Sequence, residues 1–225
     1  MGDIKNEVLR YLGYKNQKIS QELNKDIDNS IEECKAFARP KSIYKIFDIE
    51  VKENIILKGT TLSLEGKDIY NHLNSAKKCA VMAVTLGSDI DMQIRILQGR
   101  NITKSLILNA AANAYVEEIC DEVEEKIRKE AKDMGLSINY RYSPGYGDFD
   151  ISHQKKTLDI LNAGRLIGLY TNESNILIPG KSVTAFIGLF EGERPGKRCC
   201  DNCTQKNSCP YRKDGSNEIK GCFKK

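Results

Sequence analysis

The sequence predicts an α+β fold in which a mostly antiparallel sheet packs against helices, one of them long. Apolar residues with a period near 3.6 run from about residue 103 to 134 and predict a single long helix. Continuous apolar runs at 80–87 and 182–190 are typical of buried strands. Because helical and strand-like segments do not alternate strictly along the chain, an α+β fold is favoured over a doubly wound sheet.

The first 40 residues are expected to form an N-terminal helical segment, with helices at 4–13 and 19–38. Apolar residues of the second helix recur at three- and four-residue spacing and form one face: Leu23, Ile27, Ile31, Cys34 and Ala38. Arg39-Pro40 ends this helix, because the residue before a proline disfavours the helical conformation.

Strands are expected at 42–51 and 54–64, followed by a short helix at 67–78 and the apolar strand at 80–87. After the long helix, Gly135 suits the position beyond a helix C-terminus, where the left-handed conformation favours glycine.

The second half of the domain is expected to contain a strand at 137–142 and a helix at 152–162. Two apolar runs, 165–171 and 182–190, are expected to be adjacent strands joined through Pro179-Gly180.

The sequence thus predicts three regions: a helical segment at 1–40, a ligand-binding domain at 41–191 and a cysteine-rich tail at 192–225.

Composition excludes several classes of protein. Apolar residues make up 40% of the 225 residues and charged residues 29%, which is normal for a globular protein. No apolar run reaches the length of a membrane span, and the N-terminus lacks the apolar core of a secretory signal, so we expect a cytoplasmic protein. The net charge of +4 forms no basic stripe outside the last 30 or so residues, so no nucleic-acid partner is expected.

The segment from Arg141 to Gly147 contains the most informative motif. A planar guanidinium suits a carboxylate, and the turn at Pro144-Gly145 with its flanking glycine would let backbone groups approach a ligand closely. The two tyrosines of the segment could stack on a heterocycle. The loop would therefore suit a ligand with a carboxylate and an aromatic base, although the pattern alone favours a surface turn with a solvated arginine.

Three motifs resemble one known family. Arg141-Tyr-Ser-Pro-Gly-Tyr146 resembles the Arg-Pro-Ala-Pro-Gly-Tyr loop of the activation domain of cobalamin-dependent methionine synthase. Ala112-Asn-Ala-Tyr-Val-Glu117 is similar to its Ala-Glu-Ala-Phe-Ala-Glu stretch, and 172–183 is similar to its Thr-Glu-Ser and Pro-Gly-x-Ser-Val segment. The motifs occur in the family order, and the chain looks like a stand-alone form of this reactivation domain.

The resemblance implies that the chain binds S-adenosylmethionine and positions it for reductive methylation of inactive cob(II)alamin. In the family the loop arginine meets the ligand carboxylate. The ligand-binding residues carried over to this sequence are Glu117, Arg141, Ser143, Gly145 and Tyr146. The implied mechanism is orientation of the methyl group, without a catalytic nucleophile or base, and His72 and His153 are expected at the surface or at helix caps.

The resemblance also implies partners. The sequence contains no Asp-x-His-x-x-Gly motif for cobalamin ligation, so cobalamin would be carried by a cobalamin-dependent methionine synthase or a related corrinoid protein. An electron donor such as flavodoxin or ferredoxin would supply the electron. The chain is thus expected to be an accessory component of the methyltransferase.

The C-terminal tail contains five of the eight cysteines. Their spacing suggests a four-thiolate metal site formed by Cys200, Cys203, Cys209 and Cys222. An Fe–S cluster, a structural zinc and a reduced tail without metal all remain open.

Two rival functions follow from the tail. The first is a metal-centred Fe–S redox protein that reduces a corrinoid partner, and the weaker second is a zinc-tailed nucleic-acid binder.

Overall fold

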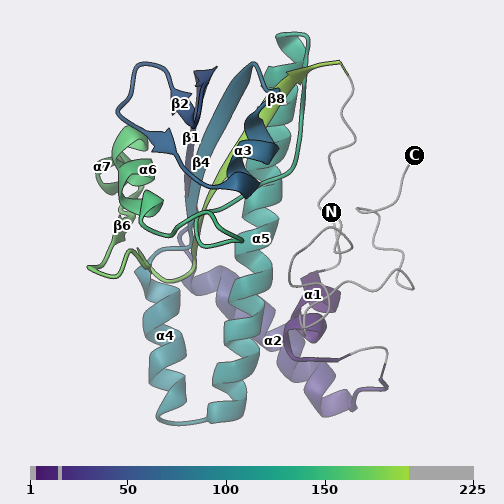
Figure 1. Ribbon diagram of the computed structural model, residues 1–225. Coiled ribbons are helices and arrows are strands. Elements are labelled where there is room, and N and C mark those ends of the chain that lie inside the picture. Colours follow the sequence, from purple (N-terminus) through teal and green to yellow (C-terminus); the bar gives the residue numbers. More distant parts are fainter. Residues whose placement is uncertain (1–3, 15–16, 193–225) are drawn as a thin grey trace.

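The computed structural model describes residues 4–14 and 17–192 and contains a six-stranded antiparallel sheet covered by helices on both faces (Figure 1). The strand order is β3-β2-β1-β4-β8-β5. The strands of this sheet are β1 (Lys41–Val51), β2 (Ile55–Leu57), β3 (Ser63–Leu64), β4 (Lys78–Thr85), β5 (Leu136–Ile138) and β8 (Ser182–Glu191). A separate hairpin consists of β6 (Tyr170–Thr171) and β7 (Leu177–Ile178). The predicted α+β class is confirmed.

The helices divide between the two faces of the sheet. They are α1 (Ile4–Tyr11), α2 (Gln21–Phe37), α3 (Lys67–Leu73), α4 (Ser88–Gln98), α5 (Ile102–Asp133), α6 (His153–Leu161) and α7 (Ala163–Ile167). Buried residues of α1, α2, α4 and α5 share one apolar core, whereas those of α3, α6 and α7 share the other. In Figure 1 the lower half of α5 extends below the sheet beside α4. No described helix has the length and apolar character needed to cross a membrane.

The central strand β4 explains why the apolar run at 80–87 has no polar interruption. Successive strand residues point to opposite faces of a sheet. Ala80, Met82 and Val84 accordingly enter the core of the long helix, while Val81 and Ala83 enter the opposite core. Both faces of this strand are covered, so both sets of side chains are apolar.

Helix α5 matches the predicted long helix. The side chain of Asn101 caps its N-terminus by accepting a 3.0 Å hydrogen bond from the Lys104 N–H. Gly135 follows its C-terminus with a φ of +73°, as the sequence predicts. Leu108 and Ile127, from the predicted apolar face, are fully buried against the sheet and neighbouring helices.

The expected strand at 165–171 is wrong. Residues up to Ile167 form α7, which ends at Gly168 with a φ of +71°, and only Tyr170 and Thr171 are extended. β6 pairs with β7 rather than with β8. A short apolar run does not distinguish helix from strand, and here α7 packs against α6 and β1.

Three other boundaries differ from the expectation. The strand at 137–142 shortens to β5; beyond it the Asn139 N–H still donates to the Gly188 carbonyl, and an isolated bridge pairs Tyr142 with Phe186. The segment 54–64 splits into β2 and β3, and α3 ends at Leu73 before β4 begins. Helix α4 was not expected, although its buried residues have helical spacing: Ile90, Ile94 and Leu97.

Candidate functional site

The loop that follows β5 is anchored to the sheet at its start. The Tyr142 N–H donates to the Phe186 carbonyl at 3.0 Å, and the Phe186 N–H donates back at 2.8 Å. Within the loop, the Gly145 N–H donates to the Phe149 carbonyl at 2.7 Å, and the Phe149 N–H donates to the Tyr146 carbonyl at 3.0 Å. The tip of the loop is therefore a closed turn, and the Tyr146 side chain at this tip is 49% exposed.

A glycine is strongly favoured at position 147. Its φ is +55°, and a Cβ there would collide with the Asp68 carboxylate and the Tyr142 hydroxyl. The neighbouring Asp148 carboxylate accepts hydrogen bonds from the N–H groups of Asp68 at 3.0 Å and Lys67 at 2.7 Å. These bonds lower the pKa of Asp148 and tie the loop to the start of α3.

Arg141 at the base of the loop faces α5. Its Nη2 lies 3.1 Å from Glu117, and its Nη1 lies 2.8 Å from Asp121 and 3.3 Å from Glu124. The Nη1 contacts are ionic, because this nitrogen has no partner in hydrogen-bond alignment. The side chain is only 18% exposed, so the interpretation of a solvated surface arginine is wrong.

The Arg141 cluster, which consists of Arg141, Glu117, Asp121 and Glu124, contains three carboxylates and one guanidinium. Burial raises the pKa of Glu124, although Arg141 and Arg128 both oppose that shift. The pKa of Arg141 is raised because the surrounding negative groups outweigh its burial. The cluster thus has an excess of negative charge and would attract a cation.

The structure brings two of the predicted ligand residues into contact, because Glu117 accepts a hydrogen bond from Arg141. Ser143 is half-buried, and its carbonyl accepts a 3.3 Å hydrogen bond from the Tyr146 N–H. Gly145 is exposed at the tip and has a φ of +93°. The assignment of all five residues to ligand binding stays a prediction.

Aromatic side chains pack against Tyr142 at the start of the loop. The Tyr142 ring lies 6.2 Å from Phe149 in a stacked arrangement and 5.3 Å from His72, centroid to centroid. Burial, together with Asp68, raises the pKa of Tyr142. The tyrosine therefore keeps its proton at neutral pH, and its hydroxyl donates to the Tyr146 carbonyl at 3.2 Å.

The two histidines have different environments. The expectation of a surface position for His72 is wrong: it is 6% exposed, with Nε2 3.3 Å from the Phe186 carbonyl. It is buried because the end of α3 packs against β8. His153 begins α6 with Nδ1 3.1 Å from the Asp150 carbonyl, as expected near a helix cap.

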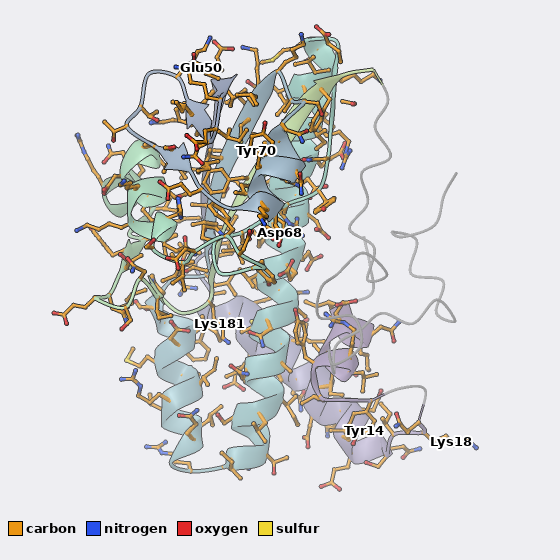
Figure 2. All side chains as sticks on the ribbon, in the orientation of Figure 1. Tyr14, Lys18, Glu50, Asp68, Tyr70 and Lys181 are labelled. Carbon is orange, nitrogen blue, oxygen red and sulfur yellow. The ribbon has the colours of Figure 1, made fainter. Side chains whose placement is uncertain are left out.

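A second cation contacts the same helix. The Lys181 Nζ donates to the Oδ1 atoms of Asn109 and Asn113, each at 2.7 Å. Figure 2 labels Lys181 between α4 and α5. Burial lowers its pKa. No sequence pattern indicated a role for Lys181, although it lies within the third motif.

The predicted metal ligands Cys200, Cys203, Cys209 and Cys222 lie outside the described residues. Within 4–14 and 17–192, no group of three or more His, Cys, Asp or Glu side chains could hold a metal ion. The cysteines of the described part are buried, and burial raises their pKa values to about 12: Cys34, Cys79 and Cys120. These three thiols are therefore protonated and structural.

No family model and no curated protein matches this sequence. Among solved structures, the chain is similar to the crystal structure of the MetH reactivation domain bound to AdoHcy. The TM-score is 0.61 at 17% identity, and the match covers 80% of this chain and 69% of that one. The chain has the fold of that domain. At this level of identity the reactivation domain is evidence for the fold alone.

Proposed function

We propose that the protein binds S-adenosylmethionine at the 141–147 loop and orients its methyl group for reductive methylation of cob(II)alamin on a partner protein. The observation that supports this proposal is the position of Arg141 and Glu117, two residues of the family motifs that are in contact. They lie in a chain with the fold of a reactivation domain. The partner would be a cobalamin-dependent methionine synthase or a related corrinoid protein.

The charges at the loop suit this ligand. S-adenosylmethionine has a positive sulfonium, and the excess carboxylates around Arg141 favour a cation. Its carboxylate would reach Arg141 by replacing Asp121, whose side chain is 72% exposed and therefore the least constrained of the three acids. The exposed ring of Tyr146 is available to stack on the adenine base.

The chemistry required of this chain is positional. A methyl group held in line with its acceptor reacts faster because orientation is arranged before the reaction. Cobalamin on the partner would supply the methyl acceptor, and flavodoxin or ferredoxin would supply the electron. Loop residues would bind and orient the sulfonium ligand, and no side chain of this chain needs to act as nucleophile or base.

Calorimetric titration with S-adenosylmethionine tests the proposal. We expect saturable binding by the wild type and about 5- to 150-fold weaker binding by Tyr146→Ala, since base–aromatic stacking is worth about 1–3 kcal/mol. Tyr170→Ala is the matched control, because Tyr170 is 58% exposed and belongs to the separate β6–β7 hairpin.

Arg141→Met tests the ionic part of the site, with Arg128→Met as its control. Arg128 also pairs with Glu124, at 2.8 Å, but lies outside the loop. Equal ligand affinity in all four variants would contradict the proposed site. Failure of the wild type to bind, together with a visible chromophore in anaerobically purified protein, would favour the Fe–S redox alternative.

A further inference from the structure

Lys181 is a half-buried cation without an ionic partner in the described part of the chain. Its contacts are the two amide oxygens of Asn109 and Asn113. Asp91 influences it only at longer range, and the carboxylate of Asp91 accepts a 2.6 Å hydrogen bond from the Gly180 N–H. An ammonium has three N–H donors, so these two bonds leave one donor available.

The two asparagines add further donors. Because their Oδ1 atoms accept from Lys181, their Nδ2 groups are oriented to donate elsewhere. Neither Nδ2 group hydrogen-bonds to another residue within the described ranges. The ammonium and two side-chain amides therefore form a cluster of unused donors, which is the chemistry that recognises an oxyanion.

This donor cluster shares a face of α5 with the Arg141 cluster. Asn109, Asn113, Glu117 and Asp121 occur at every fourth position, so each is the neighbour of the next in a row that turns gradually around the helix. With a rise of 1.5 Å per residue, Asn113 and Glu117 are about 6 Å apart along the axis. This line of residues on α5 thus runs from Lys181, which has no ionic partner among the described residues, to the carboxylates around Arg141.

We propose that Lys181, Asn109 and Asn113 form an oxyanion-binding position at the end of this line. The oxyanion is either the carboxylate of the sulfonium ligand or a separate phosphate. The first source rests on the proposed function, and it would place the ligand carboxylate at Lys181 rather than at Arg141. The second source is independent of it.

The test uses inorganic phosphate and S-adenosylmethionine as separate calorimetric probes at constant ionic strength. Lys181→Met removes the cation. Asn113→Asp keeps it but places a carboxylate within reach of Nζ, so that an internal ion pair competes with the anion. Lys45→Met is the control, because Lys45 is exposed and, among the residues that the structure describes, its Nζ donates to the Ile160 carbonyl alone.

We expect phosphate affinity to fall about tenfold or more in both site variants and to stay unchanged in Lys45→Met. If S-adenosylmethionine binding also falls in these variants and phosphate competes with it, the oxyanion is the ligand's carboxylate. If S-adenosylmethionine binding is unaffected, the position holds a separate phosphate.

The proposal is overturned if both site variants bind both probes as the wild type does, in which case any phosphate bound is adventitious. Asn113→Asp covers the case in which Lys181→Met fails to fold. Failure of the wild type to bind S-adenosylmethionine would count against the proposed function alone, because the phosphate titration would still test Lys181.

Discussion

Arg141 and Lys181 contact the same face of α5, yet their environments are opposite. Arg141 lies within 3.3 Å of three carboxylates, whereas in the described part of the chain the Lys181 ammonium donates to two neutral amides and has no ionic partner. Desolvation of a charge is unfavourable unless a partner compensates it. Arg141 is therefore compensated within the fold, whereas Lys181 keeps a charge that a ligand could compensate.

The largest expected effect concerns the loop that carries Arg141. Gly147→Ala should lower the free energy of unfolding by about 3 kcal/mol, because a positive φ is combined with a collision against Asp68 and Tyr142. Gly145→Ala should cost only about 1 kcal/mol, since its Cβ would meet only Ile151 at 3.8 Å. Urea denaturation measures both, and equal costs would show that the Asp68 and Tyr142 side chains move aside without a further loss of stability.

Next in size is the loss of Arg141 itself. Arg141→Met should destabilise the protein by about 2 kcal/mol, because Glu117, Asp121 and Glu124 would repel one another without their shared cation. Arg128→Met should cost less than about 1 kcal/mol, as is usual for exposed ion pairs. Equal losses in denaturant titrations would remove the contrast between a structural arginine and a surface one.

Lys181→Met should change the stability of the protein in the opposite direction from Arg141→Met. Removing a desolvated charge that lacks an ionic partner should leave stability unchanged or raise it by up to about 1 kcal/mol in ligand-free protein. Thermal unfolding of the variant and of Lys45→Met would measure this difference. A clear loss of stability in the Lys181 variant alone would mean that this lysine, like Arg141, is required by the fold.

The smallest effect is a pH dependence. The folded-state pKa of Lys181 is lowered, so the unfolded chain binds more protons and stability should rise as pH rises through the folded pKa. The gain should be complete near the ordinary lysine pKa and absent in Lys181→Met. Of the groups that influence Lys181, Cys34 has a pKa raised to about 12 by burial and remains protonated. If the stability of the wild type and of Lys181→Met rose equally with pH, this assignment would be contradicted.

Local patterns predicted several elements because their cause is local. Helix α5 was predicted from its apolar period and the glycine that follows it, whereas its asparagine cap at Asn101 was not predicted. The run at 165–171 shows the limit of such patterns. Its apolar residues fit helix or strand equally well, and packing of α7 against α6 and β1 decided between them.

The candidate site, too, was predicted from the sequence only in part. The motif at Arg141 could be recognised from adjacent residues, and the resemblance also indicated Glu117. Their contact, 24 positions apart in sequence, required the structure. Lys181 was missed because its partners lie 68 and 72 positions away, and nothing beside it in the sequence marks it as unpaired.

The sequence by itself determined the α+β class, the long helix and the loop motif, because periodicity, capping and turn chemistry act between near neighbours. Only the tertiary structure decided which charges compensate one another. Electrostatic energy depends on distance and burial, and both are set by the packing of segments that are far apart in the chain. The position of Arg141 among three carboxylates and of Lys181 among amides is a property of that packing.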